Sequence, residues 1–151
     1  MTIAAKLADL GITLPQAAAP VASYQPLVAH GGIAYVSGQL PFIDGALVTG
    51  KLGDTVTLER GQEAARACGL MICAQLQAAG LLERVDRVLK LGGFVASVPG
   101  FTDQPKVVNG ASDLMFEIFG EAGRHARAAV GVPVLPLDAA VEVDAIIALK
   151  D

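Results

Sequence analysis

Apolar residues recur at steps of three and four in two segments, 58–81 and about 104–120, which predicts a helix in each. Thr57 is suited to cap the start of the first helix, and Gly80 is suited to end it. The stripes expected to face the core are Ala65, Cys68, Ile72, Leu76 and Ala79 in the first helix and Val107, Ala111, Leu114 and Ile118 in the second.

Alternation of apolar and polar positions predicts strands in most of the remaining chain. The expected strands are a pair within 24–40 around the His30-Gly31-Gly32 turn, a short one at 46–49, and longer ones at 85–98, about 126–134 and about 141–149. The order β-β-α-β-α-β-β predicts an α+β domain in which both helices pack on one face of a sheet. The other face would then be open in a monomer.

The 151 residues fit one domain, in which residues 1–15 are expected to form an N-terminal helical extension. The segment "MTIAAKLADLGITLP" is typical of a short amphipathic helix that ends at Gly11 and Pro15. It lacks the apolar centre and the cleavage pattern of a signal peptide, so a cytoplasmic location is expected.

The composition is apolar for a soluble domain, with 53% hydrophobic and 17% charged residues. A membrane span needs an apolar run of about 18–20 residues, and no run in the chain approaches that length. Burial against other copies of the chain explains the balance better, because obligate interfaces resemble a core cut in half. The net charge is -4 and no Lys/Arg cluster stands out, so we expect no nucleic-acid partner.

The cysteines and histidines do not have the spacing of a metal site. Cys68 and Cys73 lie five residues apart, which is neither a metal-binding nor a redox spacing, and they are expected to be buried reduced thiols. His30 and His125 have no cysteine, histidine or acidic neighbour at ligand spacing. We therefore expect no metal.

Isolated charges stand out in the last two predicted strands: Arg127, Glu142 and Asp144. Because side chains alternate between the two faces of a strand, each charge has an assigned face. We expect the helices to cover Ala128, Val130, Val132 and Val134 in one strand and Val141, Val143, Ala145, Ile147 and Leu149 in the other. All three charges would then point to the open face, which is either a solvated polar surface or a subunit interface with a pocket. The small apolar residues on that face favour the pocket.

An arginine in such a pocket indicates an anionic ligand. Its planar fork of donors matches a carboxylate in a bidentate pair. Glu142 could act there as a general base or orient a water molecule, if burial holds its pKa near the working pH. Arg127 and Glu142 each begin a strand, so in antiparallel strands they would lie roughly 15–20 Å apart at about 3.3 Å per residue. A complete site is therefore expected to draw on two subunits.

Three motifs together resemble the Rid (YjgF) family of enamine/imine deaminases, often labelled endoribonuclease L-PSP. They are "SGQLP" at 37–41, Arg127 nine residues before Pro136, and "VEVDAI" at 141–146. The resemblance covers about residues 20–150 and is closer to a longer subgroup with an added N-terminal helix. It implies a chorismate-mutase-like fold and a homotrimer with clefts between subunits, in which the open sheet faces meet around the threefold axis.

The resemblance also implies roles for individual residues. Arg127 corresponds to an arginine that clamps the carboxylate of a 2-imino or 2-aminoacrylate-type acid, and Glu142 to a glutamate that positions the hydrolytic water. Residues implied to contact the substrate are Tyr24, Ser37, Gly38, Asn109 and Ala129, of which Gly38 acts through its backbone amide. No cofactor is implied, because an imine carbon is already electrophilic.

The chain departs from the family pattern near the arginine. Ala129 stands where the family has a cysteine, "ASY" replaces "GPY" around Tyr24, and "GRHAR" holds an extra residue. A trimeric protein that binds a small carboxylate without turnover is therefore a second hypothesis. Ribonuclease activity is disfavoured because the chain lacks a basic stripe and a catalytic histidine pair. Chorismate mutase activity is disfavoured because the similarity of the fold would be its only support. His125 is either a substrate contact or a structural residue.

Overall fold

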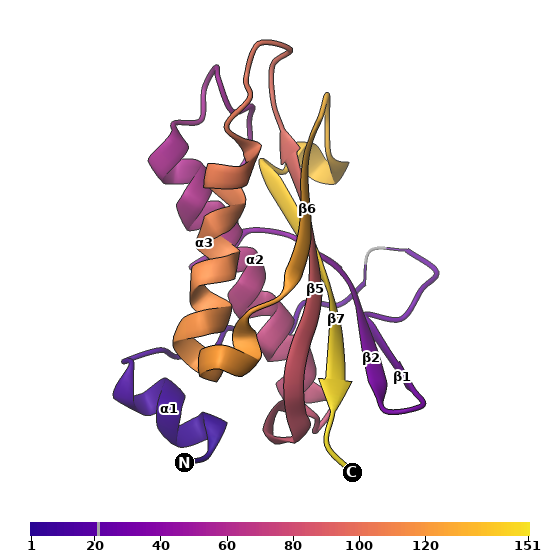
Figure 1. Ribbon diagram of the computed structural model, residues 1–151. Coiled ribbons are helices and arrows are strands. Elements are labelled where there is room, and N and C mark those ends of the chain that lie inside the picture. Colours follow the sequence, from indigo (N-terminus) through magenta and orange to yellow (C-terminus); the bar gives the residue numbers. More distant parts are fainter. Residues whose placement is uncertain (21) are drawn as a thin grey trace.

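The computed structural model describes residues 1–20 and 22–151, which fold into an α+β arrangement with a mixed sheet (Figure 1). The helices are α1 (Ile3–Asp9), α2 (Leu58–Ala78) and α3 (Gln104–Phe119). The strands are β1 (Leu27–His30), β2 (Ile33–Gln39), β3 (Phe42–Ile43), β4 (Ala46–Leu47), β5 (Val85–Ala96), β6 (Ala126–Val132) and β7 (Val141–Leu149). Short 3-10 turns occupy Leu82–Arg84, Gly120–Gly123 and Pro136–Asp138.

The main sheet has five strands in the order β1-β2-β7-β5-β6. Only β5 and β6 run parallel, and the other neighbouring pairs are antiparallel. The strands predicted at 126–134 and 141–149 therefore do not pair with each other, because β5 lies between them. This topology leaves β6 as an edge strand.

Helices α2 and α3 lie side by side on one face of this sheet, as predicted (Figure 1). The Thr57 hydroxyl caps α2 by accepting a hydrogen bond from the N–H of Arg60 at 3.1 Å, and Gly80 follows the helix with a φ of 71°. The predicted apolar stripes are buried in α3 and, up to Leu76, in α2. A Cβ at Gly69 would lie 2.9 Å from Leu114 Cδ2, so this glycine lets the two helices approach closely.

The turn predicted at His30-Gly31-Gly32 is present. Gly31 and Gly32 have φ values of 59° and 77°, the left-handed conformation that a tight hairpin between β1 and β2 requires. Asp44 and Gly45 likewise turn the chain between β3 and β4, which form a separate two-stranded sheet.

The helix predicted in the N-terminal extension is α1, and it is held against the rest of the chain. The Glu83 carboxylate accepts hydrogen bonds from the backbone N–H groups of Ile3 at 2.9 Å and Ala4 at 2.8 Å. These bonds, which favour the ionised form, lower the pKa of Glu83. Leu7 is buried on the inner side of α1.

Cys68 and Cys73 are free and fully buried, as expected. Burial raises the pKa of the Cys73 thiol to about 12 and that of the Cys68 thiol above its usual value. Both side chains therefore remain protonated thiols that act as small apolar core residues.

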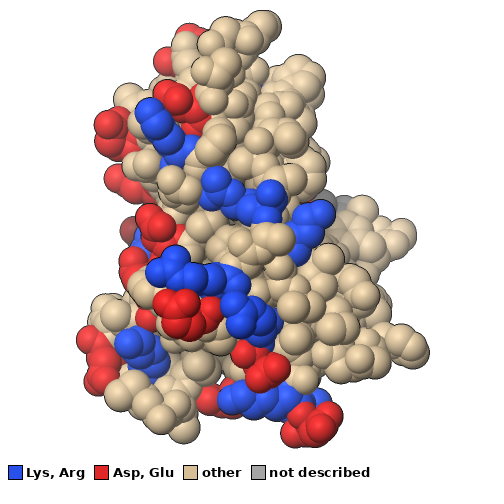
Figure 2. All heavy atoms as spheres, viewed as in Figure 1, with Lys and Arg blue, Asp and Glu red and all other residues tan. Residues whose placement is uncertain are grey.

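The two faces of the sheet differ in what they expose. We call the face opposite α2 and α3 the open face, and its exposed apolar side chains include Val28, Tyr35 and Val130. Figure 2 shows the charged residues mainly toward the helix side and the lower end, whereas the surface over β1 and β2 is uncharged. In the described part of the chain, no helix is long and apolar enough to cross a membrane.

The face assigned to β6 from sequence is wrong. Arg127 forms hydrogen bonds with α3, and Ala129 packs against the core, so both point to the helix side. Ala128 and Val130 point to the open face instead. Both faces of β6 consist mainly of alanine, valine and glycine, so apolar character alone could not distinguish them.

Candidate functional site

Arg127, near the start of β6, is bound by three acceptors from α3. Its Nη1 donates to Asn109 Oδ1 at 2.8 Å and to Ser112 Oγ at 3.1 Å, and its Nη2 donates to the carbonyl of Pro105 at 3.2 Å. These acceptors are spaced at steps of three and four on α3, so they share one side of that helix. His125 forms a hydrogen bond with Ser112. We use the name arginine cluster for four residues: Arg127, Asn109, Ser112 and His125.

The guanidinium of Arg127 keeps two of its donors available. A guanidinium has five N–H groups, and the three bonds to α3 use both on Nη1 and one on Nη2. The Nε–H and the second Nη2–H have no partner among the described residues. Two donors are the number that a bidentate pair with a carboxylate requires.

His125 directly precedes β6 and forms a hydrogen bond through each ring nitrogen. Its Nδ1 lies 2.6 Å from the carbonyl oxygen of Gly123, and its Nε2 lies 2.8 Å from Ser112 Oγ. A cavity of about 420 Å³ lies beside these groups, lined by His125, Ser112, Phe116 and Arg127 among others.

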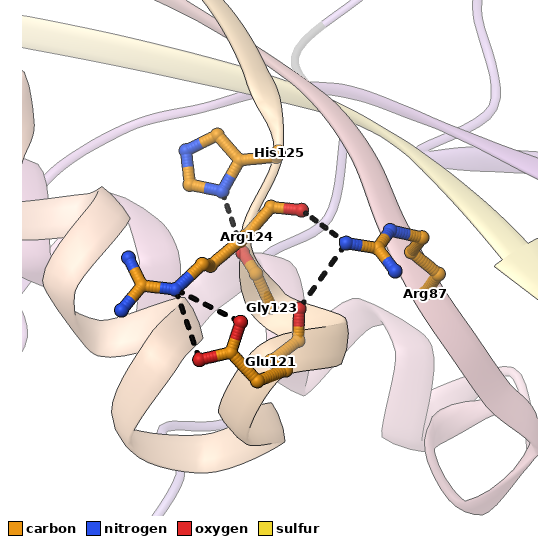
Figure 3. Close-up of polar contacts among 5 residues, drawn as sticks. All are labelled: Arg87, Glu121, Gly123, Arg124 and His125. Carbon is orange, nitrogen blue, oxygen red and sulfur yellow. Dashed lines mark hydrogen bonds and ion pairs between the residues drawn. The ribbon is translucent and has the colours of Figure 1, made fainter.

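The turn that carries His125 is fixed from β5, as Figure 3 shows. Arg87 Nη2 donates to the carbonyl oxygens of Glu121 and Arg124, both at 3.3 Å. Arg124 in turn pairs with the Glu121 carboxylate at 3.2 Å and lies over the Phe116 ring. The start of β6 is therefore anchored to both β5 and α3.

Glu142 and Asp144 lie on the open face of β7, as predicted, and both are partly buried. Burial is the main cause that raises the pKa of Glu142, and the nearby charge of Asp144 raises it further. Burial also raises the pKa of Asp144, although a backbone hydrogen bond from Gly92 and the charge of Lys90 oppose this. A carboxyl with a raised pKa is a better proton acceptor once it is ionised.

Glycines make room for these carboxylates. A Cβ at Gly38 would lie 2.5 Å from Glu142 Oε2, and a Cβ at Gly92 would overlap Asp144. Gly38 also belongs to a bulge, because Ser37 and Gly38 together oppose the single residue Asp144 of β7. We call Glu142, Asp144 and Gly38 the carboxylate cluster.

A buried pair of glutamines orients the peptide bond between Ser37 and Gly38. Gln39 Nε2 donates to the Ser37 carbonyl at 2.9 Å, and Gln75 Nε2 donates to Gln39 Oε1 at 3.2 Å and to the Ala18 carbonyl at 2.7 Å. Because a peptide bond is planar and trans, the Gly38 N–H points in the direction opposite to the Ser37 carbonyl that Gln39 binds. Sequence reasoning missed this pair, and its one local signal was the position of Gln39 in "SGQLP".

Two of the other predicted contact residues, Ser37 and Tyr24, lie near the carboxylate cluster. The Ser37 hydroxyl donates to the Gln25 carbonyl at 2.8 Å, which ties the bulge to the segment before β1. Tyr24 is 43% exposed and lines a small cavity of about 80 Å³ together with Gly38. Tyr24 and Gly38 therefore border the same cavity.

One protomer does not bring the two clusters together. Arg127 pairs with Leu91 of β5, whereas Glu142 pairs with Phe94, which is about 10 Å further along that strand at about 3.3 Å per residue. More decisively, Arg127 points to the helix side of the sheet and Glu142 to the open face. Asn109 and Ala129 belong with Arg127, and Tyr24, Ser37 and Gly38 belong with Glu142.

Two further observations concern what the site contains. Ser112 was missed from sequence, although it lies three residues after Asn109 and so on the same side of α3. Among residues 1–20 and 22–151, no group of three or more histidine, cysteine, aspartate or glutamate side chains is arranged to hold a metal ion.

Comparison with known proteins places this arrangement in a family. The profile described as "YjgF/chorismate mutase-like, putative endoribonuclease" matches residues 4–149. The chain belongs to the Rid/YjgF family. Protein TCP17 of Trypanosoma cruzi is 55% identical over 99% of this chain and 95% of its own length.

Solved structures of the Rid/YjgF family agree with the fold. A protein of unknown function from Agrobacterium tumefaciens is 49% identical, with a TM-score of 0.90 over 98% of this chain and 92% of its own. A protein named as a putative endoribonuclease from Shewanella oneidensis is 37% identical. Its TM-score is 0.93, and the match covers 99% of this chain and 100% of the other. RidA from Psychrobacter is 27% identical and superposes less closely, with a TM-score of 0.63. The match covers 89% of this chain and 94% of the other.

Proposed function

We propose that this protein hydrolyses small 2-imino or enamine acids to 2-oxo acids and ammonia in a pocket shared by two subunits of a homotrimer. The observation that carries the proposal is the pair of unused donors on Arg127, held in place by α3. They suit the carboxylate that every such substrate carries. Family membership, including the RidA structure among the matches, is consistent with this chemistry.

The reaction needs only groups that the chain itself provides. Water adds through its oxygen to the imine carbon, the carbon–nitrogen bond breaks, and the water protons end on the departing ammonia. An enamine first accepts a proton on carbon and loses one from nitrogen, and so becomes the imine. Glu142, whose pKa is raised by burial, would take the proton from the attacking water and return it to nitrogen. The Gly38 N–H would donate to the substrate beside it.

The shared pocket follows from the faces of the sheet. Because Arg127 and Glu142 of one protomer point to opposite sides, a substrate held by both requires Glu142 from another protomer. The open face supports such an assembly, because it exposes Val28, Tyr35 and Val130 next to the carboxylate cluster. A homotrimer would cover these apolar side chains and bring the edge strand β6 of one subunit to the open face of the next.

A second candidate is a trimeric protein that binds a small carboxylate without turnover. Ala129 favours it, since this residue lies on the same side of β6 as Arg127 and has no thiol where the family has a cysteine. The carboxylate site would be the same, but nothing would act on the imine nitrogen.

Ammonia release tests the two candidates against each other. An amino-acid oxidase generates the imino acid, and ammonia is followed with wild type, Arg127→Ala and no protein. Acceleration by wild type that Arg127→Ala reduces by about 100-fold or more supports the deaminase, because two charge-assisted hydrogen bonds are lost. Thermal stabilisation by 2-oxobutanoate without any acceleration identifies the binding protein. An unchanged rate for Arg127→Ala would exclude Arg127 as the carboxylate anchor.

A further inference from the structure

We infer that His125 and Ser112 are positioning residues that orient the guanidinium of Arg127 for the carboxylate of the substrate. This inference rests on the proposed function of Arg127 but concerns residues to which the family resemblance gives no role. It begins from a continuous series of hydrogen bonds from the Gly123 carbonyl through His125 and Ser112 to Arg127.

Each hydrogen bond in the series has only one workable direction. The Gly123 carbonyl can only accept, so His125 Nδ1 carries a proton, and in the neutral ring Nε2 is then an acceptor. The Ser112 hydroxyl donates its proton to Nε2 and keeps its lone pairs for Arg127, which can only donate. The neutral ring of His125 therefore prevents the Ser112 hydroxyl from turning its proton toward the guanidinium.

The alternative tautomer of the neutral ring does not fit these contacts. A ring protonated only on Nε2 would place the Nδ1 lone pair against the Gly123 oxygen at 2.6 Å. For the neutral ring, the geometry consequently selects the tautomer with its proton on Nδ1.

The backbone that carries His125 is held in place by neighbouring elements, so the imidazole has a defined position beside Ser112. Gly123 is buried, and a side chain there would overlap the backbone carbonyl of Met115, so the turn packs directly on α3. Arg87 binds the same turn from β5 through the carbonyl oxygens of Glu121 and Arg124 (Figure 3). The imidazole therefore extends from a backbone that two elements fix.

The same contacts exclude His125 as a direct ligand of the substrate. Both ring nitrogens are used, one by Gly123 and the other by Ser112. An arginine side chain loses conformational entropy when a ligand immobilises it. Acceptors that already hold the guanidinium reduce the entropy that is lost when the substrate binds. The positioning residues should therefore change the affinity for the substrate.

Nuclear magnetic resonance tests the positioning without any assumption about activity. We expect the ¹⁵N shifts of His125 to indicate a proton on Nδ1, and ¹⁵N relaxation to show an ordered Nε–H of Arg127. That order should fall in His125→Leu and in Ser112→Ala but persist in His125→Gln, whose amide oxygen can accept from Ser112. His30→Leu, at the exposed histidine that ends β1, is the matched control and should change nothing. An Arg127 Nε–H that stays equally ordered in both disruptive variants overturns the inference.

Affinity and turnover then test the consequence. His125→Leu and Ser112→Ala should each raise the Kd of 2-oxobutanoate and the KM of the imino acid about 5- to 30-fold, with kcat changed less than about 3-fold. The double variant should bind no more weakly than the single variant with the lower affinity, because both substitutions interrupt the same series of hydrogen bonds. His125→Gln should recover most of the affinity. A loss of kcat at unchanged KM contradicts the positioning role.

The two proposals fail separately. If wild type neither binds 2-oxobutanoate nor accelerates ammonia release, the proposed function is wrong, and the relaxation of Arg127 still decides whether His125 and Ser112 hold it. If wild type is active and the variants match it in KM and Kd, only the positioning role is wrong. Thermal unfolding of each variant confirms that it remains folded.

Discussion

The arginine cluster and the carboxylate cluster differ in how their surroundings prepare them for the roles proposed for them. Arg127 lies on an edge strand and owes its orientation to the hydrogen bonds that it donates to side chains and backbone of α3. Glu142 lies on a central strand and owes its raised pKa chiefly to burial, in a space left by the absent side chain of Gly38. The arginine cluster sets the direction of the Arg127 guanidinium, whereas the carboxylate cluster sets the proton affinity of Glu142.

The chemistry of the two groups explains this difference. A guanidinium is always charged in a protein, so its surroundings can change its direction but not its ionisation. A carboxyl can gain or lose its proton in the accessible pH range, so partial burial changes what it can do. Changes to the arginine cluster should therefore act on affinity, and changes to the carboxylate cluster on turnover and pH dependence.

Mixing two inactive variants gives the largest expected effect. Arg127→Ala and Glu142→Gln should each lose about 100-fold or more of the rate of ammonia release. After subunit exchange between equal amounts, about a quarter of the sites should combine an intact Arg127 with an intact Glu142 from different subunits. The measurement is ammonia release before and after exchange. No recovery, with exchange confirmed by mass spectrometry, would mean that each site belongs to one chain.

Glu142→Gln should reduce activity and increase stability at neutral pH. We expect kcat to fall on the order of 10²–10⁴-fold and to lose the rise with pH that ionisation of Glu142 gives wild type. The folded state binds the Glu142 proton more tightly than the unfolded state, so the unfolding free energy of wild type declines as pH rises through this pKa.

Denaturant unfolding of both proteins at several pH values measures the second part of this prediction. The stability gained by Glu142→Gln should disappear at acidic pH, where wild-type Glu142 is protonated as well. A variant that is less stable than wild type at pH 7 would show that Glu142 makes favourable contacts that outweigh its burial.

Gly38→Ala should have a smaller effect confined to the carboxylate cluster. The added methyl group would lie 2.5 Å from Glu142 Oε2 and would displace that carboxylate. We expect kcat to fall about 10-fold, because a displacement of about 1 Å at a reacting group costs up to about 100-fold. The Kd of 2-oxobutanoate should change little. Gly100→Ala is the matched control, since a Cβ there meets nothing within 4 Å.

Sequence reasoning located the elements well because their patterns repeat over many residues. The apolar stripe of α3, the cap at Thr57 and the Gly31-Gly32 turn each left a local signature, and the structure confirms them. The same alternation placed Glu142 and Asp144 on the open face, since the remaining positions of β7 are consistently apolar and buried.

The face of Arg127 could not be determined in this way. Strand β6 carries small apolar residues on both sides, so the choice depends on its parallel register with β5, where Arg127 aligns with the buried Leu91. That register joins segments more than thirty residues apart. The hydrogen bonds of Arg127 to Ser112 and of Ser112 to His125 depend on the same docking of α3 against β6.

The sequence by itself therefore determined the family, the order of helices and strands, and the residues from which a carboxylate site could be built. Only the tertiary structure decided which side of the sheet the residues of β6 face, and with it the separation of the arginine cluster from the carboxylate cluster. The physical reason is that element type follows from local periodicity, whereas the facing of a uniformly apolar strand is set by its long-range pairing partners.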